Sequence, residues 1–307
     1  MSGTAQIVES PPMILECVPN FSEGRRRDVA DAIAAPSKSV PGARYLDLEL
    51  DPDHNRSVLT FLGTPDAVAE AAFACAKVAV ERIDLTRHEG RHPRMGAVDV
   101  IPFIPIRDVT MDDAVRTARK VGERIGAELK VPVFLYESAA TRPDRRNLAD
   151  IRKPQFEGLR DLIGKDPDRT PDFGPTAIHP TAGCVAVGAR RPLIAYNVDL
   201  ESPDEKLAKR IAKKIRERDG GLPGIKALGL FIAERGCAQV SINVCDFTRT
   251  SLETVYAAVE RDAEAAGVKV RSSEIIGLTP QAALPPGAVV RLKMNGFRDE
   301  QVIENRL

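Results

Sequence analysis

The sequence predicts an α+β protein built from two α/β-sandwich subdomains, each a mixed or antiparallel sheet with helices on one face. Both halves of the chain alternate short β-rich runs with amphipathic helical patterns, which is the first observation behind this prediction. The chain also has 307 residues, more than one domain usually contains, and 43% hydrophobic residues, enough to fill two cores. We therefore expect a flexible tail at residues 1–12 and subdomains at residues 13–190 and 191–307.

The first elements are expected to be a strand, a helix and a hairpin. MILECVPN is an apolar run typical of a buried strand, and the helical pattern after it stops near Pro36. ARYLDLELD alternates apolar and polar residues, DPDHN supplies a turn, and RSVLTFLG is β-rich, so the three segments predict a hairpin.

The next elements carry clear start signals. Thr64-Pro65 predicts the start of a long Ala-rich helix, and Thr110-x-x-Asp113 is a capping box that opens a helix to about Leu129. Between them VDVIPFIPI is a strand, and its two prolines lack the N–H donor that a ladder needs, which places the strand at an edge or bend. VPVFLYE is the last strand before a long irregular stretch.

That stretch, residues 138–183, is rich in Pro, Arg, Asp and Gly, and structureless segments of this length are usually functional or disordered. Beyond it, helices are expected to open at Ser202-Pro203-x-Glu205 and at Thr250-x-x-Glu253. Strands are expected at CVAVGA, LIAYNVDL, LGLFIAER, AQVSINVCDF and VRSSEIIGL.

Composition excludes several classes of function. Lys+Arg and Asp+Glu both total 44, so no global field attracts nucleic acid or an anionic membrane, and small molecules are the expected partners. The five cysteines are scattered and form no C-x-x-C pair, which argues against a disulfide framework and a cysteine zinc site. No apolar run is long enough to cross a bilayer and the first residues do not resemble a signal peptide, so we expect a cytoplasmic protein.

The segment RHEGRHPRMGAVDV concentrates the candidate chemistry, and its HEGRH formally matches the zinc motif H-E-x-x-H. That motif needs a continuous helix, but Gly90 weakens a helix and Pro93 biases His92 away from helical angles. Neighbouring arginines would also repel a dication. We therefore expect no metal, which leaves loop histidines bonded to backbone groups as the simplest structural interpretation.

Several longer strings resemble the glutamate formiminotransferase family. They are CVPNFSEG, DPDHNRSVLTF, RHEGRHPRMGAVDVIPFIP, PDFGP and AQVSINVCDF, and together they span nearly the whole chain. The resemblance implies two stacked α+β subdomains with a substrate tunnel between them, tetrahydrofolate as co-substrate and a homodimer. It also matches the formiminotransferase module of formiminotransferase-cyclodeaminase without the cyclodeaminase part, so any cyclodeaminase is expected to be a separate protein.

The implied reaction moves a formimino group from N-formimino-L-glutamate to N5 of tetrahydrofolate in histidine degradation and one-carbon metabolism. By the resemblance His92 is the catalytic residue, and an imidazole suits the task because it can take a proton and return it near neutral pH. The donor carbon is positively charged, so an acidic neighbour should stabilise it. Asp47, Glu49 and Asp99 are candidates; Glu49 is our choice, although the family commonly has Asp there, and a solvated strand face is the alternative interpretation.

Two further sets of residues are expected to bind the substrates. The donor carboxylates favour guanidinium groups, and Arg56 and Arg94 are the candidates. The resemblance places the folate contact loop at GPTAIHPTAG; composition alone would make this segment an interdomain linker. The loop residues are Gly174, Pro175, Thr176, Ala177, Ile178, His179, Pro180, Thr181, Ala182 and Gly183.

Four alternative interpretations remain open. The same fold could process 5-formyltetrahydrofolate, or the protein could bind folate without catalysis. The basic helix PDEKLAKRIAKKIRERDGG could suggest RNA or membrane binding, although Leu207, Ile211 and Ile215 on one face favour a helix with a solvated outer surface. In AQVSINV, alternation places Gln239 and Asn243 on the same side of the strand, where they could face the tunnel or lie at an edge.

Overall fold

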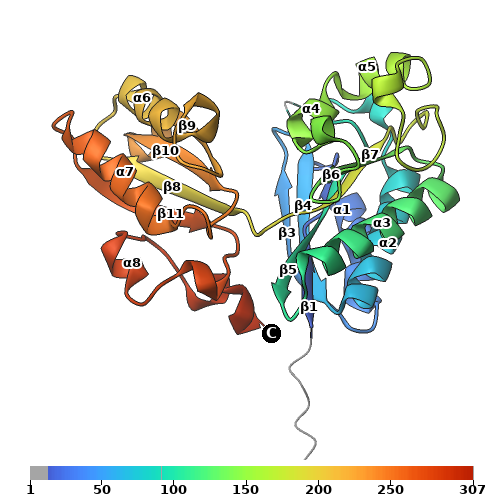
Figure 1. Cartoon of the computed structure of the whole chain (residues 1–307), viewed down its shortest axis with the longest axis horizontal. Helices are drawn as coiled ribbons and strands as arrows, with labels where there is room; N and C mark the ends of the chain where they lie inside the picture. The colour runs from blue at the N-terminus through green and yellow to red at the C-terminus, as the bar shows by residue number, and fades with distance from the viewer. Residues whose placement is uncertain (1–12, 91, 307) are drawn as a thin grey trace, which may run out of the picture. The chain divides into compact units, whose positions relative to one another are not determined.

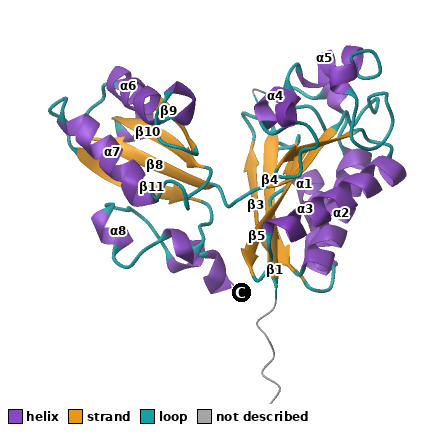
Figure 2. Ribbon diagram, in the orientation of Figure 1, coloured by secondary structure: helices purple, strands orange, loops and turns teal. Residues whose placement is uncertain are grey.

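A computed structural model describes residues 13–90 and 92–306, which form two compact units (Figure 1). The first unit ends at Arg190 and the second begins at Arg191. The tail expected at residues 1–12 lies outside the described residues. Figure 2 shows a sheet with helices in each unit, as the sequence predicts, whereas the tunnel between the units stays a prediction.

Seven strands of the described chain form a mixed sheet in the first unit, in the order β1-β4-β2-β5-β7-β6 with β3 beside β4. β7 runs parallel to β5 and to β6, and the other pairs are antiparallel. The predicted hairpin is confirmed, because β3 and β4 pair in register from Asp51↔Arg56 outward. The strands are β1 (Ile14–Cys17), β2 (Asn20–Phe21), β3 (Ala43–Asp51), β4 (Arg56–Gly63), β5 (Val98–Arg107), β6 (Val133–Glu137) and β7 (Val185–Ala189).

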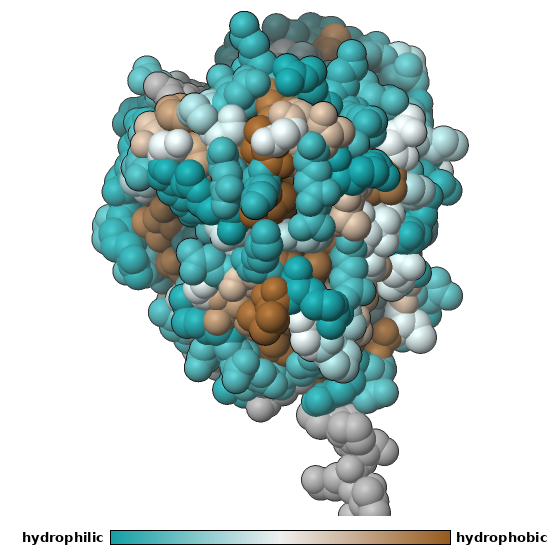
Figure 3. Space-filling model, turned by 90° about the vertical axis from the view of Figure 1, so that its left-hand side faces the viewer, coloured by the Kyte–Doolittle hydropathy of each residue, from teal (hydrophilic) through white to brown (hydrophobic). Residues whose placement is uncertain are grey.

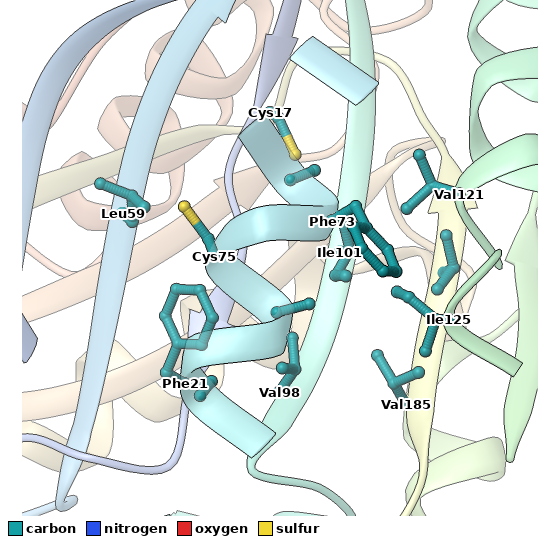
Figure 4. Packing of buried hydrophobic residues seen from close by; sticks show 14 of the residues in the cluster. Cys17, Phe21, Leu59, Phe73, Cys75, Val98, Ile101, Val121, Ile125 and Val185 are labelled. Atoms are coloured by element: carbon teal, nitrogen blue, oxygen red, sulfur yellow. The ribbon is translucent and has the colours of Figure 1, made fainter. Parts of the chain in front are cut away.

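Three helices cover one face of this sheet: α1 (Arg27–Ser39), α2 (Pro65–Arg82) and α3 (Met111–Arg124), which continues as a π-helical turn over Ile125–Leu129. Their apolar sides and alternate strand residues make the main core (Figure 4). In β4, Leu59 and Phe61 are fully buried there, whereas Arg56 points to the opposite face.

The first sheet departs from the prediction that helices lie on one face. Two short helices, α4 (Leu148–Arg152) and α5 (Gln155–Leu162), come from the stretch that was expected to be irregular. Ile151 and Leu159 pack with Val100, Phe134 and other residues on the second face of β5, β6 and β7. Central strands that carry apolar residues on both faces need cover on both, which these helices supply.

Two of the four predicted helix starts are confirmed. The Thr64 side chain accepts from the backbone N–H of Ala67, and Thr110 forms the predicted capping box with Asp113. The start predicted at Ser202 is wrong, because Asp204 caps the helix Glu205–Ile215 by accepting from the backbone N–H of Lys206. The signal at Thr250 is wrong by one residue: Ser251 caps the helix by accepting from the N–H of Thr254.

Two predictions about proline are corrected. α1 extends past Pro36 to Ser39, because the carbonyl of Pro36 still accepts from the N–H of Val40. β5 is an interior strand, not an edge strand. The carbonyl of Pro102 accepts from the N–H of Val18, which lies between β1 and β2. Pro102 has no N–H to donate, and this lack falls where β1 has ended and β2 has not begun, so no ladder bond is lost. Pro105 lies beside the irregularity in the β1–β5 register.

The second unit has an antiparallel sheet among its described residues, in the order β11-β8-β10-β9. Its strands are β8 (Ile194–Leu200), β9 (Ile225–Ile232), β10 (Cys237–Val244) and β11 (Val270–Ile276). Its helices are α6 (Glu205–Ile215), α7 (Leu252–Glu264) and α8 (Ala288–Arg291). Short 3-10 turns complete the chain at Leu85–Arg87 (η1), Pro143–Arg145, Pro167–Arg169, Glu217–Asp219, Ala233–Arg235, Gln281–Ala283, Asp299–Gln301 and Ile303–Arg306.

The basic helix α6 packs against the second core. Leu207, Ile211 and Ile215 are buried there, and the lysines between them are exposed, as the sequence predicts for a helix with a solvated outer surface. The view in Figure 3 is largely hydrophilic, with apolar side chains in small groups. None of the described helices has the length and apolar character that crossing a membrane requires.

Candidate functional site

The segment from His88 to Asp99, described except for residue 91, follows η1 and enters β5, and several of its residues are hydrogen-bonded to distant parts of the unit. The backbone N–H of Ala97 donates to the carbonyl of Ala182 (2.9 Å), and that of Cys184 donates to the carbonyl of Met95 (3.0 Å). A Cβ on Gly96 would lie 1.9 Å from the carbonyl oxygen of Cys184, so only glycine permits this approach. The candidate catalytic segment is therefore joined to the end of the predicted folate loop.

A second close approach joins the segment to the turn between β3 and β4. The side chain of Asn55 donates to the carbonyl of Glu89 (2.9 Å), and a Cβ on Gly90 would lie 2.3 Å from the carbonyl oxygen of His54. The two strings singled out in the sequence, DPDHNR and RHEGRHPRMG, thus meet in space.

A narrow pocket lies where they meet. Histidine, arginine and carboxylate side chains converge on it from β4, β5 and the two connecting segments. Its lining residues are Phe21, Ser22, His54, Asn55, Arg56, His88, His92, Arg94 and Asp99. The pocket therefore contains His92 and both predicted substrate-binding arginines.

His92 is half-buried in this pocket, and its ring meets that of His54 edge-on with centroids 6.2 Å apart. Burial, together with the positive charges of Arg56 and Arg152, lowers the pKa of His92 to about 4. The ring is thus neutral near pH 7 and is ready to accept a proton. His54 is held in turn by Asp51, whose carboxylate lies 2.5 Å from its Nδ1.

His88 has a different environment. Its Nε2 donates to the carbonyl of Asn55 (2.9 Å) and its Nδ1 accepts from Nε of Arg94 (3.1 Å), which defines a neutral tautomer with both nitrogens bonded. Residues 88–90 and 92–93 also lie outside any helix. This arrangement differs from the one that the zinc motif H-E-x-x-H requires.

Arg94 is already paired with a carboxylate. Its Nη1 and Nη2 donate to the two oxygens of Glu157 in α5, at 2.9 and 2.6 Å. This fork-to-fork pair orients Nε toward His88. To bind a substrate carboxylate with the same fork, Arg94 would have to release Glu157.

Arg56, unlike Arg94, has a neutral hydrogen-bond partner. Its guanidinium donates to the side-chain oxygen of Asn20, and no carboxylate oxygen among the described residues lies within 4.0 Å of it. Its Nε is buried and has no partner in residues 13–90 and 92–306. Burial lowers the pKa of Arg56, while the more distant Asp99 partly offsets this effect. A half-buried cation without an anionic partner favours an anionic ligand.

Asp99 is the carboxylate that lines the pocket. It is 2% exposed and accepts from Nη2 of Arg152 (2.6 Å) and from the backbone N–H of Met95 (2.8 Å). Burial raises the pKa of the Asp99 carboxyl, and the bonds to Arg152 and Met95 oppose this rise.

Glu49 lies on β3 opposite Val58, on the same sheet face as Arg56, but it is not among the pocket-lining residues. Partial burial and the charge of Asp47 raise the pKa of its carboxyl. Of the three acidic candidates, the fold thus brings Asp99 into the pocket and leaves Glu49 beside it.

The two ends of the predicted folate loop contact different parts of the first unit. Gly174 adopts φ +84° and packs against the π-helical turn after α3. At the other end, Ala182 and Gly183 pair with Ala97 and Gly96 of the candidate catalytic segment. His179 stabilises the turn between them, because its Nδ1 accepts from the backbone N–H groups of Thr181 (3.4 Å) and Ala182 (3.0 Å). The end of the loop is thus bonded to the segment that carries His92, although no loop residue is among those that line the pocket.

In the second unit, Gln239 and Asn243 share the face of β10 opposite the helices, as alternation predicts. Gln239 is buried and its side chain donates to Asp199 (2.8 Å), whereas Asn243 is exposed. Gln239 therefore belongs to a polar network of this sheet.

Sequence reasoning missed Arg152, Glu157 and the pair formed by Asp51 and His54. The last pair had a signal, since it belongs to the DPDHN turn that the pattern did identify. Arg152 and Glu157 lie in the stretch expected to be irregular, among many other charged residues, and no pattern singles them out.

Comparison with known proteins gives a consistent result over most of the chain. A family model described as "Formiminotransferase domain, N-terminal subdomain" matches residues 14–190, and one described as "Formiminotransferase domain" matches residues 195–298. A glutamate formimidoyltransferase from Streptococcus pyogenes is 47% identical over 295 residues, which cover 96% of this chain and 98% of that one.

Two other relatives extend this comparison. A glutamate formimidoyltransferase from Thermoplasma acidophilum is 44% identical, over 96% of this chain and 97% of that one. The formimidoyltransferase-cyclodeaminase of Rattus norvegicus is 43% identical over 88% of this chain, but the match covers only 51% of that longer protein.

Proposed function

The chain belongs to the formiminotransferase family, and from this membership we propose its reaction. The protein is a glutamate formimidoyltransferase: it transfers the formimino group of N-formimino-L-glutamate to N5 of tetrahydrofolate and releases L-glutamate. The observation that carries this proposal is the neutral ring of His92, half-buried in a pocket that also contains an arginine without an anionic partner.

The reaction requires one proton to leave N5 and one to reach the departing nitrogen. N5 attacks the formimino carbon and forms a C–N bond, and Nδ1 or Nε2 of neutral His92 accepts the N5 proton. The resulting imidazolium returns that proton to the glutamate nitrogen as the old C–N bond breaks. No net proton is consumed, and one residue serves as base and then as acid.

The positive charges around His92 favour the second step. Arg56 and Arg152 make its imidazolium a stronger acid, which helps it to protonate the leaving nitrogen. A donor carboxylate bound beside Arg56 offsets part of this positive charge. His92 should therefore become a better base when the donor is bound than in the free enzyme.

We assign donor binding first to Arg56, because its guanidinium has only a neutral partner among the described residues. Arg94 is the second candidate and would have to exchange Glu157 for the donor. Glu49 is proposed to face the positively charged formimino carbon from the sheet face that it shares with Arg56.

Tetrahydrofolate is the co-substrate, and residues 174–183 are proposed to contact it. The backbone pairing of Ala182 and Gly183 with the His92 segment supports this assignment for the end of the loop. By resemblance to the family we also propose a homodimer and a cytoplasmic location. Sedimentation analysis of the purified protein would test the first of these.

Replacement of His92 tests the central assignment. We expect His92→Ala to lower kcat for glutamate release by about 10²–10⁴-fold, the usual contribution of a general acid–base residue. Full turnover of formiminoglutamate by the folded variant would refute the role of His92. Parallel assays with 5-formyltetrahydrofolate, with and without ATP, test the alternative cargo.

A further inference from the structure

Arg152 and Asp99 form an ion pair that joins two distant parts of the first unit. Arg152 is the last residue of α4, and Asp99 is the second residue of β5. Their side chains are 16% and 2% exposed, and 2.6 Å separates Nη2 from Oδ2. An ion pair with so little solvent around it is poorly screened, and loss of one partner leaves an uncompensated buried charge.

The other oxygen of Asp99 bonds to the backbone of the segment that carries His92. Oδ1 accepts from the backbone N–H of Met95 at 2.8 Å, three residues after His92. One carboxylate thus connects α4, the start of β5 and the segment that carries the catalytic ring. Movement of Asp99 would release the backbone of that segment.

Arg152 also contributes charge. The charged and titratable groups around His92 are Arg56 from β4, Arg152 from α4, Asp99 from β5, His54 from the β3–β4 turn, and the neighbouring His88 and Arg94. Two of these guanidinium groups, those of Arg56 and Arg152, act on His92, and both have a buried Nε without a partner among the described residues. One buried carboxylate therefore stands against two half-buried cations.

We propose that Asp99 and Arg152 are positioning residues for formimino transfer: Asp99 holds the His92 segment in place, and Arg152, held by Asp99, presents its positive charge to His92. The proposal rests on the proposed function, because it takes His92 as the residue that moves protons. The alternative is that the pair only anchors α4 to the sheet.

Arg169 offers a matched control for the anchoring alternative. Its Nη1 donates to the backbone carbonyls of Asp150 (3.3 Å) and Ile151 (3.2 Å), so it also anchors α4. The charges with the largest effects on the pKa of His92 are those of Arg56 and Arg152, and Arg169 is not among these main contributors. Arg169→Gln therefore loosens α4 without removal of the charge that acts on His92.

The experiment is an NMR titration of the His92 ring in the full-length wild type, Arg152→Gln and Arg169→Gln. We expect the His92 pKa to rise by about 1 unit or more in Arg152→Gln, as is usual when a nearby like charge is removed, and to stay at the wild-type value in Arg169→Gln. The acidic limb of the kcat/KM profile should shift in the same direction in Arg152→Gln alone. Equal titration of His92 in both variants would overturn the proposal.

If Arg152→Gln does not fold, Arg152→Lys tests the proposal in its place. Lysine keeps the positive charge, so His92 should titrate as in the wild type; an ordinary imidazole pKa in this variant would also overturn the proposal. The titration needs no substrate. If the wild type does not transfer formimino groups, the proposed function is wrong, whatever the titration shows. If the wild type is active but the His92 pKa is unchanged in Arg152→Gln, only the positioning role is wrong.

Discussion

Two arginine–carboxylate networks, one in each unit, use the same residue types but differ in how completely they are bonded. In the second unit, Arg235 donates to Asp199 (3.0 Å) and to Glu274 (2.9 Å). The side chains of Gln239 and Asn197 donate to the remaining oxygens of these two carboxylates. All four carboxylate oxygens thus accept hydrogen bonds from the protein.

The charge balance around His92 is reversed. Arg56 and Arg152 outnumber the single buried carboxylate of Asp99, and within residues 13–90 and 92–306 the guanidinium of Arg56 donates only to the neutral side chain of Asn20. Buried charge without a partner lowers stability, and an anionic ligand can compensate for it. The network around Arg235, whose carboxylates are fully bonded within the protein, stabilises its sheet. The network around His92 has more positive than negative groups and is therefore suited to bind an anionic ligand.

The largest expected difference concerns stability after loss of one carboxylate. Asp99→Asn leaves Arg152 without its buried anion and should lower the free energy of unfolding by about 3 kcal/mol. Asp199→Asn should cost only about 1 kcal/mol, because Arg235 is 43% exposed and keeps Glu274. Urea denaturation of both variants measures this difference. Equal losses would mean that the two networks are energetically alike.

The next difference concerns the donor. Arg56→Gln should raise KM for formiminoglutamate by about 10–100-fold, corresponding to the loss of one charge-assisted contact with a carboxylate. Arg235→Gln should leave KM within about threefold, since its network is already bonded within the protein. Steady-state kinetics at saturating tetrahydrofolate make the comparison, with circular dichroism to verify folding. A similar rise in KM for both variants would contradict the assignment.

The smallest difference appears in the dependence of stability on pH. The folded protein holds the pKa of His92 near 4, below the ordinary value of about 6.5 that an unfolded chain has. As pH falls from about 6.5 to about 4, the unfolded chain binds a proton that the folded one does not, so this residue makes the fold less stable. His92→Gln should therefore lose less stability than the wild type over this interval.

Melting temperatures at pH 8 and pH 5 measure this effect in both proteins. At pH 8 the imidazole is neutral in both states, so the pH-linked contribution of His92 disappears there. A wild-type protein and a variant that lose equal stability between the two pH values would show that His92 is not held neutral by the pocket.

The sequence by itself determined the elements whose causes are local. The capping box at Thr110 and the cap at Thr64 depend on residues within one helical turn, and the hairpin depends on a short turn and two alternating strands. The sequence also pointed to the segment around His92, because its long strings of residues are distinctive. These features can be predicted without knowledge of any contact between distant parts of the chain.

Only the tertiary structure decided which charges meet. Arg152 is 53 residues from Asp99, and Arg94 is 63 residues from Glu157. A charge pattern along the chain does not specify such partners, and α4, with five residues, is too short to show a helical period. The interior position of Pro102 likewise depends on a break between two other strands. Sequence spacing does not encode pairing across the fold. That pairing leaves Arg56 without an anionic partner in the described part of the chain and keeps His92 neutral.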